Sequence, residues 1–346
     1  MRQPQVSRKL IDRLPFFYGW IVLISVCFAG FSRQGPAVAT LSIFVTPMTT
    51  EFGWSRTAIS GAVSLGGVLA ALLSPSIGSY LDRKGARVVL CFAVLSTAAT
   101  TMLLSLTESI FVFYILFCFA RMNFAGPYDL GIYGAVNNWF IRRRGFATAV
   151  VNLAQMAGLV AMPIIAQIAI IYSNWRGGWL AIGLTVLLVG FLPVWFFMIR
   201  RPEDVGLQPD GGFSGPHDPN ISKQEPQQAT EPTFNRKQAI STPAFWLLSI
   251  FTILVYPVQA GVSLHQAPHL IECGIDPTVA ATVVSTFSCV SAIVGFSLGF
   301  WPSKFPLRIV LAATGVALGT SALMMLDIAS PIDAYVASAV FGLGIG

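Results

Sequence analysis

About ten long apolar runs follow one another along the chain, separated by short polar turns. A helix needs about 20 apolar residues to cross the hydrocarbon core of a bilayer, and these runs reach that length. Only 10% of the 346 residues are charged, whereas a soluble domain carries about 25%. So few charges cannot cover the surface of a soluble domain of this size. The pattern therefore predicts an all-α integral membrane protein.

Hydropathy also predicts how the chain is divided. The predicted spans lie near residues 18–46, 57–80, 87–107, 109–138, 146–172, 177–199, 243–271, 278–301, 307–326 and 332–346. Several exceed the minimum length, which indicates tilted or bent helices. The long polar segment 200–241 holds six prolines and reads as a flexible cytoplasmic linker. We expect a six-helix bundle over 1–199 and an incomplete four-span bundle over 242–346.

The basic residues predict an orientation. Seventeen of the 21 Lys and Arg residues lie in the N-terminal tail or in every second turn. The positive-inside rule then places the N-terminus and these turns in the cytoplasm, with the chain in the plasma (inner) membrane. The net charge of +6 does not indicate nucleic-acid binding, because the bases sit in short turns rather than along one face.

Other function classes lack a signal in the sequence. The five cysteines have neither disulfide-framework nor zinc spacing. We find no nucleophile elbow and no phosphate loop, so we predict neither an enzyme nor a cofactor. The basic start of the chain and the long apolar run that follows do not resemble a cleavable signal peptide.

A short polar turn recurs later in the chain with some of its polar residues replaced. The stretch "GSYLDRKGARVVL" (Gly78–Leu90) aligns with "GFWPSKFPLRIVL" (Gly299–Leu311), and each closes the second span of its half. The alignment predicts that six spans are repeated and that the second copy is cut short. Parallel repeats of this kind belong to a transporter architecture whose substrate site lies near the bilayer midplane between the halves.

Three stretches carry a resemblance to a known family. "GSYLDRKGAR" resembles the G-x-x-x-D-R-x-G-x-R loop of the major facilitator superfamily. "WFIRRRGFATA" (Trp139–Ala149) resembles the aromatic-Phe pair, basic triplet and small-residue helix of monocarboxylate transporters. "FYGWIVL" (Phe17–Leu23) is similar to the start of helix one in that branch and in its oxalate/formate-antiporter-like relatives.

The resemblance implies a 6+6 helix architecture and alternating-access transport of a small organic anion, in the first place a monocarboxylate. Proton symport and anion exchange both stay open. The sequence departs from the pattern at Ala149 and Ala154, which replace glycines, and in span eight, which lacks the arginine common there. Helices eleven and twelve have no counterpart.

The polar turn after span two has two readings. As a positive-inside anchor its bases hold the turn in the cytoplasm, and Gly85 allows a tight bend. This reading does not explain Asp82. The resemblance implies a gate contact with helix eleven that is made in one state and broken in the other. We therefore expect gating roles for Gly78, Asp82, Arg83, Gly85 and Arg87.

Three charges lie inside predicted spans and away from the span ends. Arg33 in span one either anchors an anionic substrate or is a structural arginine near a helix bend. Arg121 and Asp129 in span four are eight residues apart, about 12 Å along the axis, so each needs another partner. Arg121 is a candidate ligand for a substrate carboxylate and Asp129 a candidate proton carrier. The alternative is a structural network through Asn123, Asn137 and Gln155.

His265 and His269 are four residues apart on one face of span seven. No carboxylate at helical spacing completes a metal site there, so we predict no metal. His265 is a candidate for proton coupling or substrate contact, since histidine titrates near neutral pH. The alternative is a polar residue that lines a cavity.

Two functional hypotheses follow. The first is a secondary transporter whose partners are a small anion and membrane lipid; no protein partner is predicted. The second is a non-transporting protein, such as a sensor or a defective truncated copy. It rests on the chain end "VFGLGIG", which lies inside an apolar run.

Overall fold

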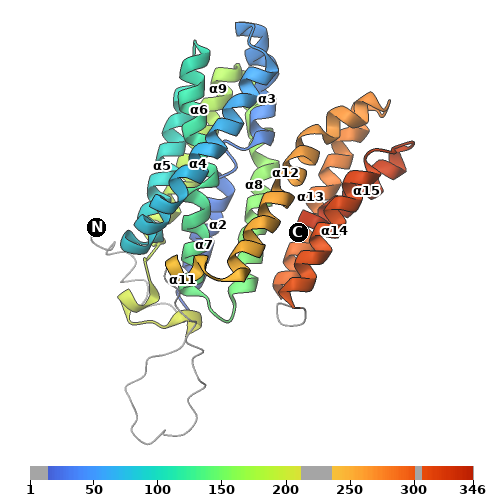
Figure 1. Ribbon diagram of the computed structural model, residues 1–346. Coiled ribbons are helices and arrows are strands. Elements are labelled where there is room, and N and C mark those ends of the chain that lie inside the picture. Colours follow the sequence, from blue (N-terminus) through green and yellow to red (C-terminus); the bar gives the residue numbers. More distant parts are fainter. Residues whose placement is uncertain (1–14, 212–235, 301–305, 346) are drawn as a thin grey trace, which may run out of the picture. The chain divides into compact units, whose positions relative to one another are not determined.

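A computed structural model describes residues 15–211, 236–300 and 306–345 of the chain (Figure 1). Every regular element in these ranges is helical, which confirms the predicted all-α class. The chain divides into two compact units, Met1–Ser214 and Gly215–Gly346. All ten predicted spans coincide with helices, although three of them are divided into shorter pieces.

The first unit contains the first six spans. Its helices are α2 (Gly19–Ser32), α3 (Val38–Phe52), α4 (Arg56–Lys84), α5 (Ala86–Leu104), α6 (Ile110–Ala125), α7 (Pro127–Trp139), α8 (Arg144–Tyr172), α9 (Trp175–Thr185), η1 (Val186–Phe191) and α10 (Leu192–Phe197). Two short 3-10 turns, η2 (Pro202–Val205) and η3 (Pro209–Gly211), follow them. Val205 and Leu207 pack against the core of this unit, so its packed part extends past residue 199.

The second unit contains the last four spans. Its helices are α11 (Arg236–Ile240), α12 (Pro243–Glu272), α13 (Pro277–Phe300), α14 (Leu307–Met324) and α15 (Pro331–Ile345). Within it, α15 packs between α13 and α14. The Ser338 hydroxyl donates to the carbonyl of Val283 on α13, and the Ser321 hydroxyl on α14 donates to the carbonyl of Ala337.

The distribution of apolar side chains fits a bilayer. In the described part, five helical segments are long and apolar enough to cross a membrane. Large apolar side chains also lie on the outside of these helices, for example Leu72, which is 70% exposed, and Ile171, which is 68% exposed. Large aromatic side chains such as Trp139 and Trp179 fill the interior of the first unit. Contact of such a surface with lipid is favourable, whereas its exposure to water costs free energy.

Two spans are broken in their middle. Span one stops at Ser32 and resumes at Val38, across the turn Arg33–Ala37 that contains Gly35 and Pro36. Span four stops at Ala125 and resumes at Pro127. Proline has no N–H for the helical ladder, which explains a break at each position. The breaks bring irregular backbone into the interior of the unit, where a membrane protein tolerates it only if protein or a wet cavity surrounds it.

The break in span one depends on a close approach to α8. A methyl group at Gly158 would lie 2.4 Å from the carbonyl oxygen of Phe31 and 2.9 Å from the Cα of that residue. Backbone atoms cannot move aside as a flexible side chain can. Glycine at this position therefore allows the last turn of α2 to touch α8.

We expect Gly158→Ala to destabilise the protein by about 1–3 kcal/mol, the usual cost of overpacking. Gly67→Ala is the matched control, because a methyl group there meets no atom within 4 Å. Thermal unfolding in detergent, followed by tryptophan fluorescence, measures both. Equal melting temperatures for the two variants would contradict the close approach.

The opposite end of the first unit, away from the basic turns, is closed by polar contacts. The Arg176 guanidinium lies 2.6 Å from a carboxylate oxygen of Glu51, at the C-terminal end of α3. The indole N–H of Trp175 donates to the other oxygen. Hydrogen bonds from Trp175 and then Arg176 lower the pKa of Glu51 below its ordinary value. This end of span one is therefore tied to the start of α9.

Candidate functional site

The break in span one places the Arg33 guanidinium inside the first unit, where its side chain is 13% exposed. Its Nη2 atom lies 2.7 Å from Asp129 Oδ2 on α7, and its Nη1 atom lies 2.5 Å from Gln155 Oε1 on α8. Its Nε atom donates to the carbonyl of Phe124, in the last turn of α6, at 2.9 Å. All three nitrogens of Arg33 therefore have an acceptor, supplied by three different helices.

Asp129 finds its partner on another span. The distance along span four excludes a direct bond to Arg121, as the sequence indicated, and the partner is Arg33. The break at Gly126 and Pro127 separates α6 from α7 between Phe124 and Asp129. One arginine thus reaches both a backbone acceptor before the break and a carboxylate after it.

A hydrogen-bonded chain supports Gln155 from behind. Its side-chain Nε2 donates to the Tyr133 hydroxyl at 3.4 Å, and this hydroxyl donates to Asn152 Oδ1 at 3.0 Å. Sequence reasoning anticipated Gln155 but missed Tyr133 and Asn152. Asn152 and Gln155 are three residues apart and share one helix face, and this spacing could have indicated that Asn152 belongs to the same network.

The other two members of the anticipated polar network lie elsewhere. The Asn123 side chain donates to the hydroxyl of Ser96 on α5 at 2.9 Å. Asn137 is exposed on α7. The network around Arg33 therefore includes Gln155 but no described hydrogen bond to either asparagine.

Arg121 lies beside this group. Its Cζ atom is 4.1 Å from the centroid of the Phe124 ring, and the Arg33 Cζ atom is 4.0 Å from the same centroid. The two Cζ atoms therefore lie no more than about 8.1 Å apart. The electron-rich face of an aromatic ring attracts a cation, so Phe124 helps to hold two positive charges in one region.

The hydrogen bonding of Arg121 differs from that of Arg33. Its Nε and Nη1 atoms are buried, and no acceptor within the described ranges bonds them. The stem packs against Gly66 on α4, where a methyl group would lie 2.6 Å from the Arg121 Cβ atom. The two arginines and Asp129 carry a net charge of about +1 when all three are ionised. A buried guanidinium N–H group without an acceptor can donate a charge-assisted hydrogen bond to a carboxylate.

The predicted gate turn packs against its own bundle. Gly85 has φ +84°, and the Arg200 stem occupies the space that a side chain there would fill. Arg200 also donates to the carbonyl of Asp82 at 3.4 Å. Buried Arg87 donates to the carbonyl of Trp195 on α10 at 2.8 Å.

Three other residues of the gate turn have no described partner side chain. The side chains of Asp82 and Arg83 are exposed, and Gly78 faces open space. In the second copy of this turn, residues 301–305 lie outside the described residues. The gating roles of Gly78, Asp82, Arg83, Gly85 and Arg87 stay predictions.

The histidine pair lies in the second unit. The side chain of His265 lies outside the described residues, so its role in substrate contact or proton coupling stays a prediction. The Nε2 atom of His269 lies 2.8 Å from the carbonyl oxygen of Met325, which ties α12 to the end of α14. His269 therefore has a structural partner.

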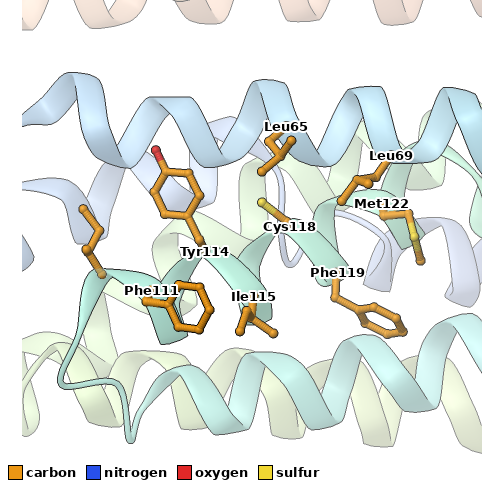
Figure 2. Close-up of a pocket in the computed structure, with 9 residues that line it drawn as sticks. Leu65, Leu69, Phe111, Tyr114, Ile115, Cys118, Phe119 and Met122 are labelled. Atoms are coloured by element: carbon orange, nitrogen blue, oxygen red, sulfur yellow. The ribbon is translucent and has the colours of Figure 1, made fainter.

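An apolar groove of about 640 Å³ lies between α4 and α6 (Figure 2). Figure 2 shows Leu65 and Leu69 on α4 above Tyr114, Cys118 and Met122 on α6. The groove is lined by Leu65, Leu69, Ile110, Phe111, Tyr114, Ile115, Cys118, Phe119 and Met122. Since no charged side chain lines it, the groove suits hydrocarbon and does not suit an organic anion.

Comparison with protein families gives a match over most of the chain. The model of the "Major Facilitator Superfamily" matches residues 22–346. The membrane sensor protein UhpC of Salmonella typhimurium is 26% identical over 264 residues, which cover 73% of this chain and 58% of that protein. The oxalate:formate antiporter of Oxalobacter formigenes is 25% identical over 288 residues, which cover 80% of this chain and 63% of the antiporter. The chain thus spans about three-fifths of the length of these relatives.

Solved structures show the same fold. A bacterial homologue of the iron transporter ferroportin, in the outward-facing state, matches with a TM-score of 0.62 at 17% identity, over 95% of this chain and 82% of that one. A bacterial homologue of the human lysosomal transporter Spinster, inward-facing and occupied, matches with a TM-score of 0.61 at 16% identity, over 94% and 72% of the two chains.

Proposed function

Because the chain belongs to the Major Facilitator Superfamily, we propose that it takes part in secondary active transport of a small organic anion by alternating access. The superfamily supports the transport mechanism. The anion is our proposal, and the oxalate:formate antiporter among the relatives agrees with it. We also propose that the chain lies in the plasma membrane with its basic turns and N-terminus in the cytoplasm.

The difference in hydrogen bonding between Arg33 and Arg121 supports an anionic substrate. Arg33 is bonded at each of its three nitrogens, whereas two nitrogens of Arg121 have no described acceptor. A buried donor without an acceptor costs about 1–3 kcal/mol, and more when it is charged. A substrate carboxylate that accepts a hydrogen bond from Arg121 reduces this cost. The net charge of about +1 suits a monoanion, so a monocarboxylate fits the charge balance.

The Arg33–Asp129 ion pair is compatible with two mechanisms that couple anion transport to a second solute, proton symport and anion exchange. In symport, a proton on Asp129 weakens the ion pair and frees Nη2 of Arg33 for the substrate. In exchange, the incoming carboxylate competes with Asp129 for that nitrogen, and a second anion replaces it on the return. His265 stays a further candidate proton carrier, and its side chain lies outside the described residues.

Uptake into proteoliposomes tests the proposal. Radiolabelled formate, oxalate, L-galactonate and a hexose phosphate serve as probes, because the relatives carry these names. In symport, an acidic outer pH raises uptake into empty vesicles. In exchange, uptake requires unlabelled anion inside. The absence of uptake of all four probes under both driving conditions would contradict transport of a small anion.

A second candidate function is a membrane sensor of an anion. The sensor proteins of Salmonella typhimurium and Escherichia coli, each 26% identical, favour it. A sensor binds the anion through the same arginine but does not accumulate it. Ligand-induced thermal stabilisation that depends on Arg121, without uptake, would favour the sensor over the transporter.

A further inference from the structure

A carboxylate far along the chain closes the turn between α7 and α8. Asp210, in η3, accepts hydrogen bonds from the backbone N–H groups of Ile141 at 2.9 Å, Arg142 at 2.6 Å and Arg143 at 3.3 Å. These three consecutive residues lead into α8. Asp210 follows them by 67 to 69 residues, after span six has ended.

The contact supplies acceptors for the turn that leads into α8. The N-cap residue of α8 is Arg143, and its side chain makes no capping hydrogen bond. The first N–H groups of a helix have no partner within the helix, and the helix dipole favours a negative charge there. Three successive N–H groups that converge on one carboxylate form an anion-binding concavity. Asp210 therefore fixes the turn immediately before the 29-residue helix α8, and it bonds the N–H group of the N-cap residue Arg143.

The backbone at Asp210 is unusual and is held in place from another side. Asp210 has φ +59°, and Gly211, the next residue, has φ +80°. Aspartate tolerates this left-handed region better than most residues, but it is still disfavoured. A methyl group at Gly211 would lie 3.2 Å from the ring of Phe17, whose centroid is 5.9 Å from those of Trp139 and Phe140. The start of span one and the end of span four thus cover the turn.

The capped turn joins the two helices that hold Arg33. Asp129 and Tyr133 lie on α7, and Gln155 lies on α8, about 18 Å from the turn along the helix axis. A change of angle between α7 and α8 moves the acceptors of Arg33 apart. Arg121 lies on α6 and is not displaced directly by such a change.

We propose that Asp210 is a clamp that holds α7 and α8 in one rigid arrangement, and that this arrangement is needed for turnover. The need for this arrangement in turnover rests on the proposed transport function. The clamp acts on helix positioning, so its loss lowers the maximal rate of uptake, while the apparent affinity set by Arg121 stays nearly constant.

Asp210→Ala and Asp210→Asn test the clamp, with Asp204→Asn as the control. Asp204 is an exposed carboxylate in the neighbouring turn η2. Hydrogen–deuterium exchange of the peptide over residues 140–147 reports on the capped N–H groups. We expect exchange there to rise about tenfold in Asp210→Ala, corresponding to about 1.4 kcal/mol, and less in Asp210→Asn, which keeps one acceptor oxygen. The control is expected to match the wild type.

Uptake supplies the second measurement. We expect the maximal rate to fall about fivefold in Asp210→Ala with KM within about twofold of the wild type. Unchanged exchange over 140–147 overturns the clamp. Raised exchange with a wild-type maximal rate overturns its role in turnover. If the wild-type protein transports none of the probes, the transport proposal fails, and the exchange measurement still decides whether the clamp exists. If Asp210→Ala does not fold, Asp210→Asn provides both measurements.

Discussion

Replacing Arg121 by alanine is expected to lower anion uptake by about 100-fold or more. Truncating one partner of a buried, hydrogen-bonded charge pair costs about 2–5 kcal/mol, and 2.8 kcal/mol is about 100-fold. In the described part of the chain, two buried nitrogens of Arg121 have no acceptor, so its loss removes the donors that we assign to the substrate. Initial rates over a range of formate and oxalate concentrations measure the effect.

Two further variants sharpen this test. Arg121→Lys keeps the charge but loses the planar fork, so we expect KM to rise about tenfold with a smaller change in the maximal rate. Arg56→Ala removes an exposed arginine at the start of α4 and is the matched control. Folding is checked by thermal stability, which Arg121→Ala is expected to change little, because the removal of a buried unpaired charge offsets the loss of the contacts with Gly66 and Phe124. Wild-type uptake in Arg121→Ala would place the anion elsewhere.

Replacing Asp129 by asparagine is expected to impair both folding and coupling. The change leaves Arg33, whose side chain is 13% exposed, without its countercharge. We expect a loss of about 2 kcal/mol in the free energy of unfolding, in the range of a hydrogen bond between charged groups. If transport is proton symport through Asp129, uptake also becomes independent of outer pH, because asparagine carries no titratable proton. Thermal unfolding and uptake between pH 5.5 and 7.5 measure the two effects.

The double variant Arg33→Gln with Asp129→Asn separates stability from function. Removing both charges leaves neither member of the pair as an uncompensated ion, so we expect most of the lost stability to return. Uptake is not expected to recover, because a neutral pair cannot respond to a proton or to an incoming carboxylate. A double variant as unstable as Asp129→Asn alone would show that the ion pair does not account for the loss. An unaltered pH profile in Asp129→Asn would assign the proton to another group, with His265 as the next candidate.

The two arginines show how far sequence reasoning reached. Hydropathy placed Arg33, Arg121 and Asp129 inside predicted spans. Because burying a charged side chain in a membrane costs free energy, the three residues were identified as candidates for a functional site. The sequence left both arginines as candidates for substrate binding, each with a structural role as the alternative. Only the tertiary structure distinguishes them, because Arg33 is bonded to Asp129, Gln155 and the Phe124 carbonyl, while two nitrogens of Arg121 have no described acceptor.

The Asp210 contact was not accessible from sequence at all. Residues 200–241 read as a linker, since they contain six prolines and almost no apolar periodicity. Asp210 nevertheless fixes the turn before α8 by bonding three backbone N–H groups 67 to 69 residues earlier. Every residue except proline has a backbone N–H group, so the identities of residues 141–143 do not indicate that these groups bond to Asp210.

By itself the sequence determined the all-α membrane class, the positions of the spans and the superfamily. These properties follow from the transfer of side chains between water and hydrocarbon, which sums over local stretches of about 20 residues and can be read in one dimension. The tertiary structure decided where the helices break, which acceptors Arg33 takes, and which donors of Arg121 stay open. These contacts join residues about 90 to 120 positions apart and depend on distances of a few ångströms, which local composition does not encode.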